Sequence, residues 1–249
     1  MNRYKIIFVL VFCLMIQFNC SKHEINFSVQ PVENLFESAM TDFQAKRYDQ
    51  AIAGFSSVIF NYPGSRYAAD AQYFLALSYF EKEDYQQAVI EFDFFIRNFP
   101  TSTYLESATV QLALAYLRSA PPIEKDQSQL LKAREVLEEF TERFPASKFL
   151  TGVEQVQAEL LDRLALKEYN AATLYFRARE FAAAKVYYEH ILREYSETEW
   201  AKKAKLPLAI CYAHNGFKAD AIELLEEIVK DDTDPKLQKK AAAQLKKLK

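Results

Sequence analysis

The chain has 249 residues, half of them hydrophobic, and carries a formal net charge of −3 at pH 7. This balance lacks the strongly basic face that nucleic-acid binding requires, so we expect no nucleic-acid partner. Only 4 glycines and 8 prolines interrupt the chain. Because hairpin-rich folds need turn glycines, such a low number predicts an all-α protein.

The N-terminus has the pattern of an export signal. Basic residues in positions 1–5 precede an apolar run from Ile6 to Ile16, and Cys20 follows shortly after. The run is too short to span a bilayer as a helix, which takes about 20 residues. A cysteine in this position accepts diacylglycerol in bacterial lipoproteins, which this leader resembles. We therefore predict a signal peptide over 1–19, a lipid on Cys20 and a lipidated tether over 20–31.

One alternative for the leader stays open. The residues before Cys20 are Gln17-Phe18-Asn19, a loose fit to a lipoprotein signal, so the alternative is an ordinary signal peptide that leaves Cys20 as a free thiol. In lipoproteins an Asp next to the cysteine signals inner-membrane retention, whereas Ser21 stands here. We therefore predict an outer-membrane anchor with the protein facing the periplasm.

The cysteines predict no intrachain disulfide in the exported chain. Cys13 leaves with the leader, Cys20 carries lipid, and Cys211 alone remains. Its apolar neighbours indicate a buried small hydrophobe rather than a nucleophile. Cohesion must then come from buried apolar surface.

A short motif repeats along the chain: an aromatic residue, proline, any residue and serine. The three copies are Tyr62-Pro63-Gly64-Ser65, Phe99-Pro100-Thr101-Ser102 and Phe144-Pro145-Ala146-Ser147. Successive prolines are 37 and 45 residues apart. A period in this range is typical of a solenoid, in which each unit buries its apolar face on its neighbours.

The spacing inside the unit is that of a tetratricopeptide repeat, a pair of antiparallel helices. Ala88 and Phe92 precede Pro100 at the offsets at which Ala51 and Phe55 precede Pro63. Alanines let paired helices approach closely, and aromatic rings fill the space between them. Two further units begin near Ala171-Ala172 and Leu208-Ala209, which makes five.

We therefore predict a tetratricopeptide-repeat α-solenoid of about five helix pairs, with a linking helix and a C-terminal capping helix. Repeats 1–3 occupy 32–146, and the linking helix, repeats 4–5 and the capping helix occupy 147–249. The longer third interval places an insertion over 119–126, where Pro121-Pro122 prevents helix continuation. The linking helix is expected over 147–166, before the first helix of repeat 4.

No catalytic constellation is present in the sequence. The histidines, His23, His190 and His214, are scattered and lack the spacing of a helical metal pair. A glycine-rich phosphate loop and a nucleophile elbow are both absent. We expect no enzyme activity, no metal and no cofactor.

Together these features resemble the BamD family, lipoproteins of the outer-membrane β-barrel assembly machine. The segment that carries the likeness best is Tyr85-x-x-Ala88-x-x-x-Phe92-Asp93-x-Phe95-Ile96-x-x-Phe99-Pro100. The resemblance implies that the N-terminal repeats receive the C-terminal signal of unfolded outer-membrane proteins. It also implies that the C-terminal repeats dock the POTRA-type periplasmic domains of a membrane-embedded assembly protein.

Candidate binding residues follow from the repeat register and the resemblance. First helices line the concave side of such a solenoid, so we expect a peptide groove at Gln72, Tyr73, Gln111 and Arg118. Family members often carry an arginine in the second helix of repeat 4 where this chain has Tyr187; the contact has changed, or Arg179 or Arg193 substitutes.

The repeat tyrosines and the C-terminal lysines each admit two interpretations. Tyr79, Tyr116, Tyr175 and Tyr212 occupy the packing position of the repeat, so we interpret them as core rather than contact residues. Lysines at 236, 239, 240, 246, 247 and 249 could meet anionic headgroups or an acidic partner, at about 1 kcal/mol per charge near a membrane. We favour the other interpretation, in which they offset the helix macrodipole.

An alternative function also fits the spacing: a tetratricopeptide lipoprotein adaptor in cell-envelope maintenance or secretion.

Overall fold

A computed structural model describes residues 31–230 and 234–249. That part of the chain holds eleven helices and no strand. The helices are α2 (Val32–Gln44), α3 (Tyr48–Asn61), α4 (Ala68–Glu81), α5 (Tyr85–Asn98), α6 (Leu105–Ser119), α7 (Ser128–Arg143), α8 (Leu150–Arg177), α9 (Phe181–Glu194), α10 (Glu199–His214), α11 (Lys218–Lys230) and α12 (Pro235–Leu248). The predicted signal peptide over 1–19, Cys20 and the tether up to residue 30 lie outside the described residues.

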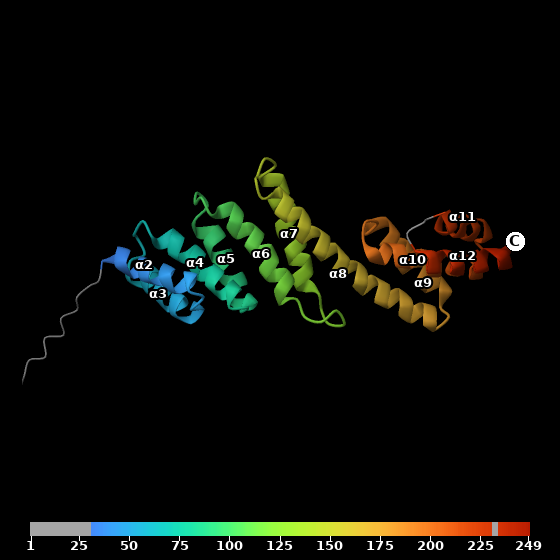
Figure 1. Cartoon of the computed structure of the whole chain (residues 1–249), viewed down its shortest axis with the longest axis horizontal. Coiled ribbons are helices and arrows are strands. Elements are labelled where there is room, and N and C mark those ends of the chain that lie inside the picture. The colour runs from blue at the N-terminus through green and yellow to red at the C-terminus, as the bar shows by residue number, and fades with distance from the viewer. Residues whose placement is uncertain (1–30, 231–233) are drawn as a thin grey trace, which may run out of the picture.

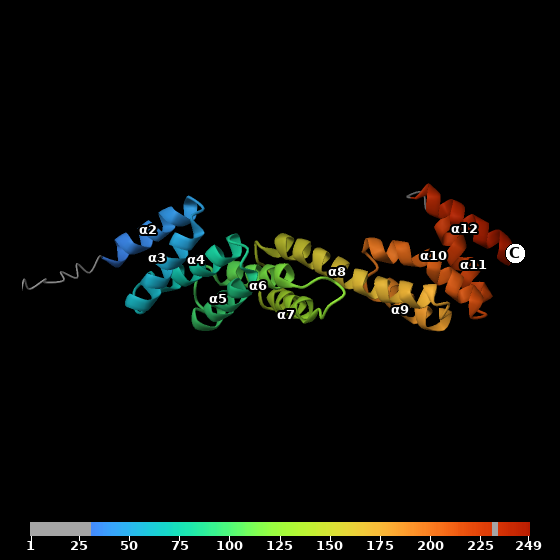
Figure 2. The same ribbon diagram turned by 90° about the horizontal axis from the view of Figure 1, so that it is seen from below.

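The helices stack one after another into an elongated array, with α2 at one end and α12 at the other (Figures 1 and 2). Each helix packs mainly on its neighbours in the chain, which is the organisation of a repeat solenoid. The prediction of an all-α tetratricopeptide-type solenoid is confirmed. Five pairs run from α2–α3 to α10–α11, and α12 covers the last pair.

The residues that predicted the pairs form the core. Ala88 and Phe92 of α5 are fully buried, as are Ala51 and Phe55 of α3. The two helices of the first pair approach so closely that a Cβ on Gly54 would lie 2.7 Å from the Ala39 Cβ. Small residues at the crossing thus set the distance between helices, and rings fill the flanks.

The linking helix differs from the prediction. It is continuous with the first helix of repeat 4, so α8 is a single helix of 28 residues. Its N-terminal half packs on α6 and α7, and its C-terminal half packs on α9 and α10. The segment Leu166-Lys167-Glu168-Tyr169-Asn170 contains no glycine or proline, so nothing in it stops the helix.

The predicted insertion lies between α6 and α7, and α8 holds it in place. Arg163 of α8 donates to the carbonyl oxygen of Leu117 at 2.7 Å and to that of Pro121 at 3.5 Å. Gln127, which is buried, donates from its Nε2 to the carbonyl oxygens of Pro122, at 2.9 Å, and Lys125, at 3.2 Å. A charged donor at the last carbonyls of α6 also favours the end of that helix.

Among residues 31–230 and 234–249, no helix combines the length and the apolar character needed to cross a bilayer.

Candidate functional site

Two of the four predicted groove residues lie inside the stack. Gln72 is 2% exposed and Tyr73 is 6% exposed. The Gln72 Nε2 donates to Glu91 Oε2 at 2.7 Å, which ties α4 to α5, and a 2.9 Å hydrogen bond joins the Tyr73 hydroxyl to Ser107 Oγ. Burial raises the pKa of Tyr73. The expectation that these two side chains face a ligand is wrong, because both serve contacts between helices.

A recurring aromatic contact explains the burial of Tyr73. The ring stacks against Tyr104, a linker ring that precedes the first helix of the next repeat, and Phe36 of repeat 1 stacks against Tyr67 in the same way. The ring centroids are 5.0 Å apart for Phe36–Tyr67 and 4.3 Å apart for Tyr73–Tyr104, and in repeat 4 Tyr169 contacts Trp200, at the start of α10, with tilted rings 5.3 Å apart. The signal in the sequence is an aromatic residue two positions after each linker serine, as in Ser65-x-Tyr67 and Ser102-x-Tyr104.

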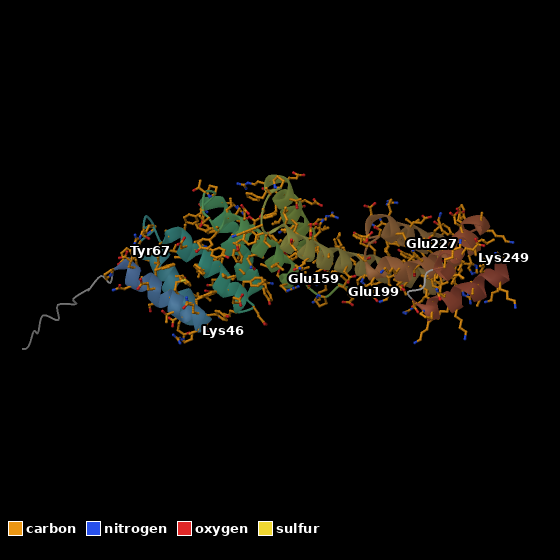
Figure 3. All side chains as sticks on the ribbon, turned by 45° about the horizontal axis from the view of Figure 1, so that its top comes forward. Lys46, Tyr67, Glu159, Glu199, Glu227 and Lys249 are labelled. Atoms are coloured by element: carbon orange, nitrogen blue, oxygen red, sulfur yellow. The ribbon has the colours of Figure 1, made fainter. Side chains whose placement is uncertain are left out.

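The other two groove residues lie on α6 and are accessible to different degrees. Gln111 is half-buried, and its Oε1 has no hydrogen-bond partner among the residues described. Arg118 is exposed and paired with Glu159 of α8, to which its Nη2 donates at 2.9 Å. This hydrogen bond raises the pKa of Arg118 and lowers that of Glu159. Glu159 lies near the middle of the molecule, where α8 crosses α6 (Figure 3).

The three candidate docking residues do not form one cluster. Arg179 is in the turn before α9, with a left-handed backbone at φ 63°, whereas Arg193 is in the last turn of α9. At 1.5 Å per residue they are roughly 20 Å apart along the helix. Arg193 contacts Glu194 at 2.7 Å, and this hydrogen bond lowers the pKa of the Glu194 carboxyl. Docking that uses all three residues therefore needs the whole length of α9.

Tyr187 stacks on Tyr175 of α8, with ring centroids 5.3 Å apart. Tyr175 is 36% exposed, so its assignment to the core is wrong, while Tyr79, Tyr116 and Tyr212 are half-buried as packing residues. Leu174 and Val186, beside the stacked pair in the chain, are also exposed. Repeat 4 therefore presents an apolar, aromatic surface where the family resemblance places an arginine.

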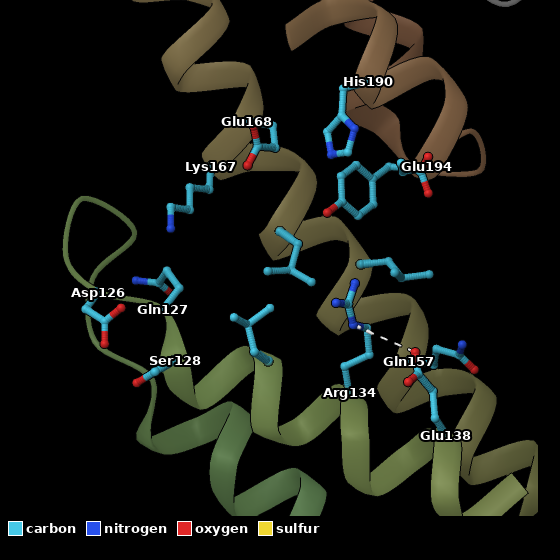
Figure 4. Close-up of a pocket in the computed structure, with 14 residues that line it drawn as sticks. Asp126, Gln127, Ser128, Arg134, Glu138, Gln157, Lys167, Glu168, His190 and Glu194 are labelled. Atoms are coloured by element: carbon cyan, nitrogen blue, oxygen red, sulfur yellow. Dashed lines mark ion pairs between the residues drawn. The ribbon is translucent and has the colours of Figure 1, made fainter.

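A cleft of about 620 Å³ lies on the flank of α8, between α7 and α9 (Figure 4). It exists because α8 is long enough to separate the second helix of repeat 3 from that of repeat 4. Apolar side chains contribute to the lining: Leu131 of α7, Leu161 and Leu164 of α8, and Tyr195 after α9. The repeat pattern of the sequence does not reveal this cleft, because it follows from the unbroken length of α8.

Charged groups of both signs surround the cleft. Arg134 and Lys167 contribute positive charge, and Glu138, Glu168 and Glu194 contribute negative charge. Figure 4 shows the ion pair between Arg134 and Glu138, whose side chains approach to 3.7 Å. An apolar lining with a mixed-charge rim suits a peptide or a helix better than a small charged metabolite.

The described parts of the chain contain no group of three or more His, Cys, Asp or Glu side chains that could hold a metal ion. His190 lies 3.2 Å from the Arg193 Nη2, and His214 stacks on Phe181 at 4.0 Å between ring centroids. Both histidines thus take part in local packing. Cys211 is buried, as predicted, and burial raises the pKa of its thiol to about 12.

Comparison with known proteins gives a family and a set of similar folds. Residues 29–224 match the family model described as YfiO, outer membrane lipoprotein. The sequence matches no curated protein.

Three tetratricopeptide-repeat proteins are among the solved structures to which this chain is similar. A TPR protein of Thermus thermophilus is 18% identical, with a TM-score of 0.39 over 86% of this chain and 99% of its own. The TPR2AB domain of yeast Sti1, solved as a complex with pHSP90, is 15% identical, with a TM-score of 0.47 over 87% and 84%. A TPR protein of Bacteroides fragilis NCTC 9343 is 16% identical, with a TM-score of 0.43 over 88% and 87%.

Proposed function

Because the chain belongs to the YfiO family of outer membrane lipoproteins, we propose that it is a scaffold of the β-barrel assembly machinery on the periplasmic face of the outer membrane. Its lipid is attached to Cys20, and it acts by binding other proteins rather than by bond-making chemistry. The observation that carries the proposal is the family match over residues 29–224, which spans nearly the whole helical stack. The assembly role itself rests on the resemblance to BamD.

The C-terminal repeats offer the partner-docking surface in this proposal. The stacked rings of Tyr175 and Tyr187, with exposed Leu174 and Val186 beside them, provide apolar area of the kind that protein interfaces bury. Arg179 and Arg193 flank this area at the two ends of α9. The partner is an assembly protein with POTRA-type domains, and the aromatic pair replaces the ionic contact that the resemblance implies.

The N-terminal repeats take the substrate signal in this proposal. With Gln72 and Tyr73 buried, the accessible candidates are Gln111 and Arg118 on α6. Because Arg118 is already paired with Glu159, a substrate carboxylate at this point has to compete with that ion pair. Substrate contact therefore depends on salt and on the position of α8.

Affinity capture from detergent-solubilised membranes tests the partner. The intact lipoprotein is expected to co-purify with a β-barrel protein that carries periplasmic repeats, and Tyr187→Ala is expected to reduce its yield several-fold. Phe60→Ala is the matched control, because Phe60 is 86% exposed on α3 and belongs to no proposed surface. Recovery of only envelope-maintenance or secretion partners supports the alternative adaptor function and refutes the assembly role.

Site-specific photo-crosslinking tests the substrate. A photoreactive residue at Gln111 or Arg118 is expected to capture unfolded outer-membrane protein, whereas the same residue at Phe60 is not. Equal capture at all three positions would contradict a groove on α6.

A further inference from the structure

The last helix separates charge from apolar surface cleanly. Over its 14 residues α12 has five lysines and no acidic residue. The lysines are all exposed: Lys236, Lys239, Lys240, Lys246 and Lys247. At 100° per residue they cover one side of the helix, while Leu237, Ala241, Leu245 and Leu248 cover the opposite side and pack on α10 and α11. The lysine face of α12, defined by these five residues, therefore points away from the core.

The macrodipole does not account for this face. Cations stabilise the C-terminal end of a helix and are unfavourable near its N-terminal end, where backbone amides carry partial positive charge. Lys246 and Lys247 are in the last turn of α12, but Lys236, Lys239 and Lys240 are in its first half. Only Lys246 and Lys247 therefore gain from the dipole, because Lys236 in the first turn opposes it and Lys239 and Lys240 are too far from either end of the helix for it to act on them.

Among the described residues, the lysine face has no ion-pair partner. Within the described residues none of its five lysines forms an ion pair, whereas Lys249, just beyond the helix, contacts Glu226 at 2.9 Å. Lys240 also lines, with Lys202 of α10, a cavity of about 390 Å³ whose lining includes the carboxylates of Glu199 and Asp234. Because none of the five forms an ion pair with a described carboxylate, their charge is available to an external anionic partner.

We propose that the lysine face of α12 rests on anionic phospholipid headgroups. The apolar side of α12 is already buried, so this face binds through charge, and a lipid surface offers the extended array of anions that a row of lysines matches. A membrane is within reach, because the chain belongs to a family of outer membrane lipoproteins. This inference concerns lipid contact and does not depend on the β-barrel assembly role.

The contact defines how the molecule lies on the membrane. The lipidated end of the chain precedes α2, and α12 is at the far end of the array (Figure 1). Anchors at both ends lay the long axis of the solenoid along the bilayer, so that its binding surfaces stay near the membrane. A polybasic patch is a recognised second signal that acts with a lipid anchor.

Vesicle flotation tests the proposal. The protein starts at residue 20 and carries Cys20→Ser, so that no lipid contributes and every described residue is retained. It is expected to float with phosphatidylcholine vesicles that contain about one third phosphatidylglycerol, and not with phosphatidylcholine alone. Raising the salt from about 0.05 M to about 0.5 M is expected to release it.

Two charge-matched variants locate the contact. The first variant changes four lysines of the face together to Gln: Lys236, Lys239, Lys240 and Lys247. It is expected to lower partitioning into the anionic vesicles at least about tenfold. The second variant removes the same charge elsewhere by changing four other lysines to Gln: Lys125, Lys132, Lys148 and Lys167. It is expected to retain binding within about twofold. Thermal melting checks that both fold, since neither set touches the apolar side of α12.

The proposal is overturned if the Cys20→Ser protein with all its lysines does not bind anionic vesicles. That result is expected if the face binds an acidic protein instead. Equal losses in the two variants, or binding to neutral vesicles that salt does not release, overturn it as well.

Discussion

Left-handed backbone recurs at the turn between the two helices of a repeat. Lys46, Glu83 and Arg179 have φ of 58°, 67° and 63°, and Gly216 has 85°. Lys46 and Glu83 are one period of 37 residues apart, and so are Arg179 and Gly216. Only glycine adopts this conformation without a steric cost, so three of the four turns hold the less favourable residue.

Replacing Glu83 by glycine is therefore expected to stabilise the protein by about 0.5–1 kcal/mol, since relief of strain exceeds the added freedom of the unfolded chain. The free energy of unfolding from urea titration measures the change. Gly216→Ala is the reciprocal control: a Cβ there meets nothing within 4 Å, so its expected loss of about 1 kcal/mol is conformational. A destabilised Glu83→Gly variant would contradict the argument.

Gly54 is constrained by packing instead. A Cβ on Gly54 would lie 2.7 Å from Ala39 Cβ, so α2 and α3 must separate to admit it. Gly54→Ala is expected to destabilise the protein by about 1–3 kcal/mol although alanine favours helices. In contrast, Gly152→Ala in α8 meets nothing within 4 Å and is expected to stabilise by up to about 1 kcal/mol. Opposite shifts of melting temperature check the pair, and shifts of the same sign would exclude a steric cause.

At the scale of elements, the sequence predicts the helix pairs well because each pair depends on a few residues with fixed spacing. Ala88 and Phe92 recur one period from Ala51 and Phe55, and all four are fully buried. The capping helix also follows from local chemistry. Asp234 directly precedes α12, and its side chain accepts hydrogen bonds from the backbone amides of Lys236 and Leu237 in the first turn. The length of α8 was predicted incorrectly because the repeat pattern marks the start of repeat 4, not the end of the helix before it.

The candidate site was harder to predict, because side-chain exposure depends on the next repeat. Tyr73 contacts Phe92 and Phe95 within its own helix pair, and the ring of Tyr104 from the following linker completes its burial. The cleft between α7 and α9 likewise depends on the length of a third helix. A sequence pattern that describes one repeat at a time therefore does not predict the contacts between repeats of unequal spacing.

Arg163 couples the insertion to the solenoid, and its removal is expected to loosen that segment. Arg163→Met deletes the bond from Nη1 to the Leu117 carbonyl oxygen, at 2.7 Å, and the charge at the end of α6. A loss of about 1–2 kcal/mol is expected, with faster hydrogen exchange over residues 119–126. Arg134→Met is the control, because its ion pair with Glu138 is exposed and is worth under about 1 kcal/mol. Unchanged exchange over the insertion would show that other contacts hold it.

At the scale of the whole molecule, the C-terminal repeats are the part most sensitive to alkali. Burial raises the pKa values of Cys211 and Tyr188 to about 12, and burial with the bond to Glu189 does the same for Tyr212. In the unfolded chain the thiol ionises near pH 9 and the phenols near pH 10. Stability from these groups is complete below pH 9 and is lost as the pH rises towards 12.

Alkylation of Cys211 with iodoacetamide reports this opening, because the buried thiol reacts only when the C-terminal repeats open. Labelling is expected to rise between pH 9 and 12, before helicity falls in the whole chain. Tyr188→Phe is expected to move the labelling midpoint to higher pH, since one buried ionisable group is removed. Rapid labelling at neutral pH would contradict the buried position.

The helix α8 fixes the orientation of the two ends of the molecule relative to each other. This is because α7 and α9 lie on either side of the cleft and pack on different halves of α8. Lys167 is exposed at the cleft, between Leu164, which packs with the core of repeat 3, and Tyr169, which packs on Trp200. Lys167→Pro removes one backbone hydrogen bond and kinks the helix there, at about 3 kcal/mol. Lys167→Ala removes the same charge and keeps the helix.

The proline variant is expected to change the maximum dimension measured by small-angle X-ray scattering while circular dichroism retains most of the helicity, and the alanine variant is expected to match the wild type. A partner that contacts both ends should then be captured less by the proline variant, whereas one that binds the last two repeats alone should be retained. Superimposable scattering of all three proteins would mean that the shared apolar core from α6 to α10, rather than the continuity of α8, fixes the shape.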